Sequence, residues 1–332
     1  MNNIGSNDEK LPFVERFRPK TLDDVISHHD IIYTLKSFIK TQNIPHLLFY
    51  GPPGTGKTST IEAFVTELYG DDNVEFMTMN INASEERGIE IVRNKISNFV
   101  KTGPVYRVPT DKKLPVYKFV ILDEADAMTL DAQATLRKVI ESYTYNARFC
   151  LICNYIKGID DAIRSRCTVF KFSSLDYDSV VGRILEISKI SNVSITEDGL
   201  NMMWKLSNGD MRKVLHMIQV ISIGYKIITA DVITCFHKYP TDDDINTLYK
   251  VFICGDIGRS VKELNKIVRS KGYALIDIVN ELSQYIVQNL INHSLDKKIG
   301  SNVILRLRDI EMNLIVTQDT QIQIMAIASV FC

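Results

Sequence analysis

Gly51-Pro-Pro-Gly-Thr-Gly-Lys-Thr58 is the stretch of this sequence that decides the fold. It follows the apolar run Leu47-Leu-Phe-Tyr50 and leads into an amphipathic segment at residues 59–68. A strand, a glycine-rich turn, Lys-Thr and a helix, in that order, form the arrangement of a P-loop. The structural alternative is an ordinary turn between a buried strand and a helix. The complete GxxxxGKT spacing in this context favours the P-loop.

The motif predicts a site for the phosphates of a nucleotide. Glycine allows backbone conformations and a close approach that a Cβ would block. Successive N–H groups can then point at phosphate oxygens at the positive end of the following helix. Lys57 would reach the β- and γ-phosphates, and the hydroxyl of Thr58 would hold Mg²⁺. The predicted nucleotide-binding residues of this stretch are Gly51, Pro52, Pro53, Gly54, Thr55, Gly56, Lys57, Thr58 and Ser59.

A second stretch, Phe119-Val-Ile-Leu-Asp-Glu124, runs from apolar residues directly into a pair of carboxylates. These acids are predicted to sit at the carboxyl end of a buried parallel strand, where open α/β sheets bind their ligands. Asp123 would complete the Mg²⁺ shell, and Glu124 would polarise the attacking water. Adjacent acids after a strand also occur by chance. Because they lie downstream of an intact P-loop, the Walker B interpretation is favoured.

The tetrapeptide Asp123-Glu-Ala-Asp126 also names a family of RNA helicases. Those enzymes need a second RecA-like domain with its own arginine-rich motif. Residues 175–332 are predicted to be almost wholly helical, and the chain contains no His-Arg-x-Gly-Arg-like run. The sequence therefore argues against a helicase of that family.

Length and composition indicate a globular protein with an ordinary apolar content. Its 332 residues suggest roughly two or three domains. The net charge of −1 indicates no general affinity for polyanions, so any contact with nucleic acid must use a local basic face. The six cysteines are dispersed, no signal peptide precedes them, and no apolar run reaches the ~18 residues of a membrane span. We expect a soluble intracellular protein with free thiols and no membrane contact.

The N-terminal half alternates predicted helices and strands. The patterns predict an extended segment at 11–20, a helix at 30–41, a strand at 74–82 and a loop at 101–116.

Two hydroxyl residues of this half are predicted to cap helices. Ser84 would cap the helix that follows it, and Thr129 would cap a helix at 130–142. On the second of these helices, Gln133, Arg137 and Lys138 are expected to face outward.

Two polar residues at the ends of elements are further candidates. Asn154 follows an apolar strand and would lie beside the nucleotide, although a lone amide there is weak evidence by itself. Asp210 is a predicted N-cap that places Arg212 in the first turn, where a cation opposes the helix dipole. A ligand would explain that arginine, and a surface position is the alternative. Cys150 and Cys153 have redox-motif spacing, but an odd offset on a strand places them on opposite faces.

Several motifs together resemble one family. Beside the P-loop they are Phe13-Val-Glu-Arg-Phe-Arg-Pro19, Asn82-Ala-Ser-Glu-Glu-Arg-Gly88, Leu122-Asp-Glu-Ala-Asp126, Ser165-Arg-Cys167 and Gly209-Asp-Met-Arg212. From about residue 11 onward the chain resembles the small subunits of replication factor C, the eukaryotic sliding-clamp loader among the AAA+ ATPases. The Ser-Arg-Cys triplet is highly specific for this family.

The resemblance implies an organisation and a function. It implies an α/β AAA+ RecA-like ATPase domain (1–172), a three-helix lid (173–237) and an all-α oligomerisation collar (238–332). The implied activity is Mg²⁺-dependent ATP hydrolysis that loads the ring-shaped sliding clamp (PCNA) onto primer–template DNA during replication and repair. The implied setting is a hetero-pentamer of replication factor C subunits in the nucleus.

The resemblance also implies roles for single residues. Val14 and Arg18 would border the adenine. Asn154 would be the first sensor of the γ-phosphate and Arg212 the second. Arg166 would be an arginine finger that completes the neighbouring subunit's site, and we expect no local partner for it.

DNA contact is implied for the helices that start near Ser84 and Thr129, which would follow the phosphate backbone. Such contacts recognise shape and charge without sequence, so a modest basic cluster suffices. The candidates are Arg87, Arg93 and Arg137.

Two other functions stay open from the sequence. One is a structural subunit that binds nucleotide without hydrolysing it, against which the intact Lys57, Thr58, Asp123 and Glu124 argue. The other is a different AAA+ machine, such as a branch-migration motor or a protein remodeller. The Ser-Arg-Cys triplet and the long helical C-terminal region weigh against it.

Overall fold

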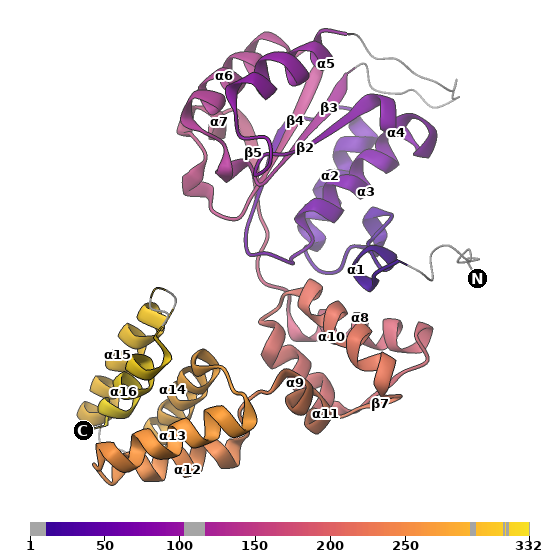
Figure 1. Cartoon of the computed structure of the whole chain (residues 1–332). Coiled ribbons are helices and arrows are strands. Elements are labelled where there is room, and N and C mark those ends of the chain that lie inside the picture. Colours follow the sequence, from indigo (N-terminus) through magenta and orange to yellow (C-terminus); the bar gives the residue numbers. More distant parts are fainter. Residues whose placement is uncertain (1–10, 103–116, 293–296, 315, 317–318, 332) are drawn as a thin grey trace. The chain divides into compact units, whose positions relative to one another are not determined.

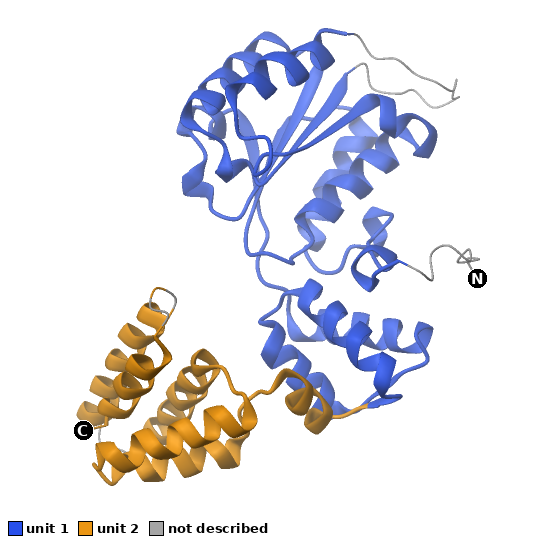
Figure 2. Ribbon diagram, viewed as in Figure 1, with its two compact units in different colours: residues 1–227 blue, residues 228–332 orange. Residues whose placement is uncertain are grey.

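The computed structural model describes residues 11–102, 117–292, 297–314, 316 and 319–331. The chain divides into two compact units, residues 1–227 and 228–332, whose boundary falls within β7 (Ile227–Ile228) (Figure 2). The three-domain division with boundaries after residues 172 and 237 stays a prediction. The loop expected at 101–116 lies almost entirely outside the described residues.

Unit 1 is built around a parallel sheet of five strands in the order β2-β3-β4-β1-β5 (Figure 1). This sheet confirms the expected α/β class. Because parallel strands end at the same edge of a sheet, the residues that follow β1, β3 and β4 come together there. The strands are β1 (His46–Tyr50), β2 (Thr78–Asn82), β3 (Lys118–Asp123), β4 (Ala147–Cys153) and β5 (Cys167–Lys171).

Alternate residues of the strands face two separate apolar cores, one on each side of the sheet. Leu47 and Phe49 of β1 belong to one core, and Leu48 belongs to the other. Cys150 and Cys153 of β4 also lie in different cores, as their spacing predicts. The first core includes residues of α2 (His29–Thr41), α3 (Lys57–Tyr69) and α4 (Asp71–Met77), and the second includes residues of η3 (Ile91–Ile96), α5 (Ser97–Lys101) and α6 (Leu130–Ser142).

Unit 1 also contains short helical turns. They are α1 (Phe13–Arg16), η2 (Leu22–Asp24), η4 (Ala125–Ala127), η5 (Ile156–Gly158) and α7 (Asp161–Arg164).

Three longer helices, here called the lid helices, follow β5 in unit 1. In each of them the side chain of the N-cap residue accepts a hydrogen bond from the first turn. The caps are Asp176, Thr196 and Asp210, so the predicted cap at Asp210 is confirmed. The lid helices are α8 (Tyr177–Ile190), α9 (Glu197–Ser207) and α10 (Met211–Gly224), with the short strand β6 (Ser194–Ile195) between the first two.

Unit 2 is helical throughout its described residues after β7 and has an apolar core of its own. Leu248, Phe252, Ile278 and Leu282 are completely buried in that core. None of the described helices is long and apolar enough to cross a membrane. The helices are α11 (Ala230–His237), α12 (Asp242–Ile253), α13 (Ile257–Lys271), α14 (Leu275–Ile291), α15 (Lys297–Leu314) and α16 (Thr320–Ser329).

Two predicted elements are wrong in part. Of the strand expected at 74–82, only Thr78 onward is a strand, because the preceding residues form α4. Gly70, with φ of 80°, precedes that helix, and Asp71 and Asp72 lie in its first turn, where the helix dipole favours acids. The segment expected to be extended at 11–20 contains the helical turn α1.

Two expectations for side chains beside the sheet are also wrong. Ser84 caps no helix: its hydroxyl donates to Oδ1 of Asn82 at 2.8 Å, and helical structure resumes only after Gly88. Gln133 is 2% exposed and does not face outward. Its amide donates to the carbonyl O of Gly158 at 2.9 Å and accepts from the N–H of Asp160 at 2.8 Å, which satisfies a buried polar group.

Candidate nucleotide-binding site

The P-loop joins the carboxyl end of β1 to the first turn of α3. Gly54 has φ of 70°, a value that favours glycine. A Cβ at Gly51 would lie 2.0 Å from the carbonyl O of Phe172, so no side chain fits there. The buried hydroxyl of Thr55 donates to the carbonyl O of Pro52 at 3.0 Å and closes the loop on itself. The loop therefore presents its backbone at a helix N-terminus, where anions bind.

Lys57 is buried at the base of this loop. Its Nζ donates to the carbonyl O atoms of Gly51 and Pro52, each at 2.7 Å, and to Oδ1 of Asn154 at 3.1 Å. Burial lowers the pKa of the ammonium, and the charge of Asp123 opposes that shift. The structure thus brings the P-loop lysine to the residue predicted to sense the γ-phosphate.

Thr58 and Asp123 meet where the sequence predicts Mg²⁺. The hydroxyl of Thr58 donates to Oδ2 of Asp123 at 2.8 Å, and the N–H of Glu124 donates to Oδ1 of the same carboxylate at 2.8 Å. Mg²⁺ is commonly bound by one or two carboxylates together with substrate phosphates, so these oxygen ligands fit it. Glu124 is exposed and has φ of 52°, a left-handed conformation of the kind found at functional sites.

Asp126 fixes the backbone at Asn154. Its Oδ2 accepts hydrogen bonds from the N–H groups of Asn154 at 3.2 Å and Tyr155 at 3.1 Å. Gly158 packs against the same aspartate, because a Cβ there would lie 2.7 Å from Cβ of Asp126. No role of its own was predicted for Asp126, although it ends the motif Leu122–Asp126.

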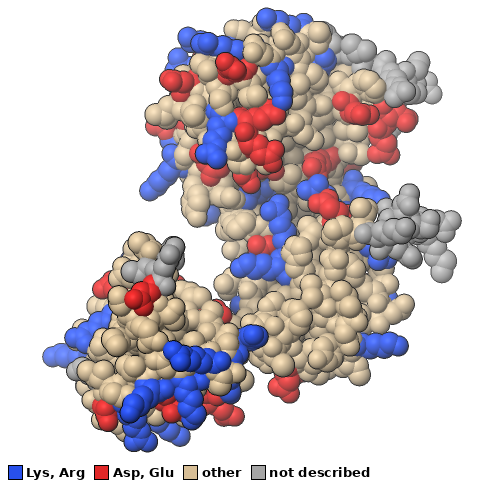
Figure 3. Space-filling model, viewed as in Figure 1, with Lys and Arg blue, Asp and Glu red and all other residues tan. Residues whose placement is uncertain are grey.

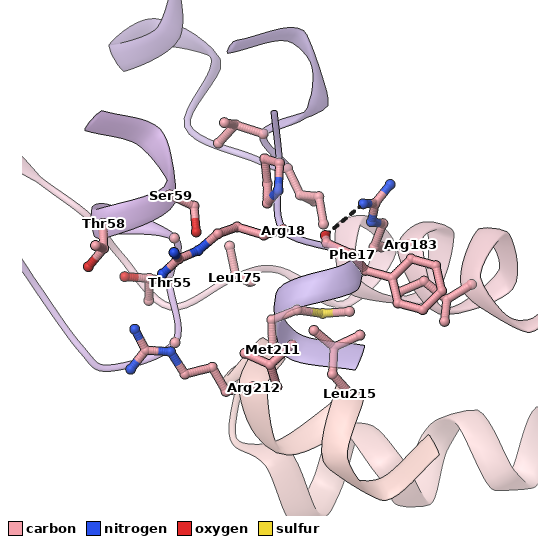
Figure 4. Close-up of a pocket in the computed structure, with 17 residues that line it drawn as sticks. Phe17, Arg18, Thr55, Thr58, Ser59, Leu175, Arg183, Met211, Arg212 and Leu215 are labelled. Atoms are coloured by element: carbon pink, nitrogen blue, oxygen red, sulfur yellow. Dashed lines mark hydrogen bonds between the residues drawn. The ribbon is translucent and has the colours of Figure 1, made fainter. Parts of the chain in front are cut away.

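A pocket next to the P-loop is largely apolar (Figure 4). Such a surface beside a phosphate-binding loop is suited to a flat base. Val14 and Arg18, the residues expected at the adenine, both line it, as does Arg212. Its lining consists of Val14, Phe17, Arg18, Pro19, Val25, Ile26, Gly54, Thr55, Gly56, Thr58, Ser59, Leu175, Arg183, Ile187, Met211, Arg212 and Leu215.

The contribution of the lid helices to this pocket was not predicted from the sequence. Met211 and Leu215 lie on α10, and Arg183 on α8 donates to the carbonyl O of Phe17 at 3.0 Å (Figure 4). Helical spacing alone cannot distinguish a pocket-lining residue from an ordinary core residue. Of the predicted loop residues, Gly51, Pro52, Pro53 and Lys57 do not line the pocket, and both prolines are exposed.

The two predicted arginines of the pocket have different contacts. A guanidinium N of Arg18 lies 3.0 Å from a carboxylate O of Glu62 on α3. Burial raises the pKa of Glu62, and Arg18 opposes that shift. The backbone N–H of Arg212 donates to Oδ1 of the cap residue Asp210 at 2.9 Å, and Arg212 lines the pocket.

The expectation that Arg166 has no local partner is wrong. Its Nη2 lies 2.6 Å from Oε1 of Glu141 on α6, and its Nη1 donates to the carbonyl O of Ala162 at 2.6 Å. Glu141 could not be recognised as a partner from the sequence, because α6 and the residues before β5 come into contact only in the folded chain. Arg166 does not line the pocket of its own chain.

The three arginines predicted to contact DNA come from two segments that meet on one face of the sheet. Arg87 and Arg93 are exposed, and Arg137 on α6 is half-buried. The N–H of Thr129 donates to the carbonyl O of Arg87 at 3.4 Å, which joins the segments. On the face shown in Figure 3, both Lys and Arg and Asp and Glu are present in each unit, in agreement with a balanced net charge.

Two family models match the chain. The ATPase family associated with various cellular activities (AAA) matches residues 47–175, which include the P-loop, Asp123 and Asn154. The replication factor C C-terminal domain matches residues 240–330, all of which lie in unit 2.

Relatives match over nearly the whole chain. Replication factor C subunit 5 of Mus musculus is 39% identical over 323 residues, which cover 97% of this chain and 91% of the relative. Replication factor C subunit 3 of Saccharomyces cerevisiae is 39% identical over 324 residues, with 95% and 91% covered.

A solved structure shares the fold at low identity. The Thermotoga maritima RuvB Holliday junction branch migration motor superposes with a TM-score of 0.53, and the match covers 78% of this chain and 86% of that one. The sequences are 14% identical, so this likeness concerns the fold alone.

Proposed function

The chain belongs to the replication factor C family of AAA ATPases, and we propose that it is one small subunit of a hetero-pentameric clamp loader. It is an ATPase, and its function is clamp loading in DNA replication. One observation carries this conclusion: the same chain has a P-loop site built from Lys57, Thr58 and Asp123 and a replication factor C C-terminal domain.

In the proposed cycle, ATP bound at the P-loop holds the loader in the state that opens the sliding clamp (PCNA) on primer–template DNA. Hydrolysis then releases the clamp on the DNA, during replication and repair. Mg²⁺, held by Thr58 and Asp123, would neutralise charge on the phosphates. The eukaryotic relatives are replication factors, which supports a nuclear location.

Each residue of the site has a proposed role. Val14 and Arg18 border the adenine, a role that their place in the pocket supports. Lys57 contacts the β- and γ-phosphates, and Glu124 polarises the attacking water.

The proposed sensors report the γ-phosphate to two parts of unit 1. Asn154 accepts from the Lys57 ammonium, so it lies next to the group that binds that phosphate. Arg212 lies in the first turn of α10, where it connects the phosphate to the lid helices.

Two sets of arginines are proposed to act on other molecules. Arg166 would complete the site of a neighbouring subunit, which its absence from the lining of its own pocket supports. Arg87, Arg93 and Arg137 would contact DNA phosphates. Unit 2 would supply the collar through which the subunits assemble. Its separate apolar core supports a role in assembly that is distinct from nucleotide binding in unit 1.

The second candidate is a subunit that holds nucleotide without turnover. The exposed Glu124 beside the Thr58–Asp123 pair weighs against it, because a subunit that only bound nucleotide would need no catalytic carboxylate.

Loading of a labelled clamp onto primed circular DNA tests the proposal. We expect the clamp to elute with the DNA in gel filtration only when ATP, the primer, the partner subunits and this chain are all present. Unprimed circular DNA is the control. Equal loading without this chain, or without ATP, would contradict the proposal.

A further inference from the structure

Arg166 is held in place by two elements of its own chain. Its Nη2 lies 2.6 Å from Oε1 of Glu141 on α6. Its Nη1 donates to the carbonyl O of Ala162 at 2.6 Å and to the hydroxyl of Ser165 at 3.4 Å. A guanidinium has more N–H donors than these contacts use, so Arg166 keeps donors for another group.

The ion pair is exposed on both sides. The side chains of Arg166 and Glu141 are 39% and 43% exposed, and exposed pairs contribute little to folding stability. Removal of the Glu141 charge should therefore leave the fold intact. Its main effect is expected on the orientation of the Arg166 guanidinium.

A third charge lies beside this pair. Oε1 of Glu141 is also 3.9 Å from Nε of Arg137, one turn earlier on α6. The two guanidinium groups around one carboxylate leave this cluster with a net positive charge. Glu141 can thus orient Arg166 while the cluster still attracts a phosphate.

We propose that Glu141 is a positioning residue that holds the guanidinium of Arg166 ready for a phosphate bound by the neighbouring subunit. The inference rests on the proposed role of Arg166 in trans. A flexible arginine loses rotamer freedom when it binds, and this cost falls when contacts within its own chain already order it. Glu141 acts through Arg166, with no contact of its own to the nucleotide.

A double-mutant cycle in the assembled complex tests this inference. ATP turnover is measured at the neighbouring site, with the other P-loops of the complex disabled, for Glu141→Gln, Arg166→Ala and the double variant. Glu141→Gln should lower kcat about tenfold, because rotamer freedom returns to Arg166, and should leave KM for ATP nearly unchanged. In the Arg166→Ala background the same change should cause no further loss.

Glu67→Gln, a matched change at an exposed residue of α3, is the control, and gel filtration checks that each variant enters the complex. An equal loss from Glu141→Gln in both backgrounds, or no loss at all, would overturn the positioning role while Arg166 keeps its own. Unchanged turnover in Arg166→Ala would instead overturn the role of Arg166 in trans, and the inference with it.

Discussion

Gly54 in the P-loop lies directly against Asp210, the N-cap of α10: a Cβ at position 54 would be 1.7 Å from Oδ1 of that aspartate. The carbonyl O of Gly54 also accepts a hydrogen bond from the N–H of Met211 at 3.3 Å. The phosphate-binding loop and the first turn of α10 therefore touch with almost no side chain between them. Through this contact, a change in the loop on nucleotide binding can bias the position of the lid helices.

Gly54→Ala should weaken ATP binding, because the new methyl group would displace either the loop or Asp210. The left-handed backbone adds about 1–2 kcal/mol of strain. Gly70→Ala is the matched control: Gly70 has φ of 80° and nothing within 4 Å of an added Cβ. It should lose stability in thermal unfolding and keep its ATP affinity in calorimetry. Equal ATP affinity in the two variants would contradict a tight contact between the loop and α10.

Lys57→Ala should weaken ATP binding about 10- to 100-fold, because hydrogen bonds to a charged group contribute roughly 1.5–3 kcal/mol. Titration with a fluorescent ATP analogue measures the loss. Lys40→Ala, at an exposed lysine of α2, should bind like the unaltered chain. Unchanged affinity in Lys57→Ala would refute the assignment of the loop.

The parts of the site that were predictable from sequence are local in the chain. The P-loop and the acids after β3 need a fixed spacing beside a strand, and such a spacing can be read directly. Asp126 and Glu141 were given no partner, and the contact of Asp210 with Gly54 was not expected, because these contacts depend on how distant elements pack.

The errors in the predicted strand at 74–82 and in the predicted orientation of Gln133 have a related cause. Val74, Phe76 and Met77 are apolar, and their spacing fits a strand or a short helix equally well. The structure resolves the ambiguity through packing, with Met77 fully buried in the core beside α3. Gln133 was misplaced because only the folded chain reveals the buried backbone groups that it satisfies.

The three predicted DNA contacts should behave as phosphate contacts. Arg87→Ala or Arg93→Ala should weaken binding of the complex to primer–template DNA by a similar factor for every sequence. The slope of log K against log salt should fall by about one for each arginine removed. Lys40→Ala, whose helix α2 packs on the other core of the sheet, is the control. A loss that depends on base sequence would contradict backbone recognition.

Removal of most of unit 2 should separate assembly from nucleotide binding. A chain that ends at Tyr239 keeps both cores of unit 1 and should fold and bind ATP. It lacks the core of α12–α16 and should fail to enter the complex in gel filtration. The full-length Lys57→Ala chain is the complementary control, because it should assemble and bind ATP weakly. Normal incorporation of the shortened chain would refute the collar assignment.

This chain is expected to hydrolyse ATP at its own P-loop, and Glu124→Gln tests that activity. The amide keeps the shape of the side chain and cannot accept a proton from the attacking water. ATP turnover is measured in the complex with the partners' P-loops disabled, beside ATP binding by the same preparation.

We expect ATP binding to persist in Glu124→Gln while turnover falls about 10²–10⁴-fold, the usual contribution of a general base. Equal turnover with and without the substitution would show that Glu124 is not the catalytic carboxylate. No turnover in the unaltered chain would contradict ATP hydrolysis at this P-loop and favour a subunit that only holds nucleotide.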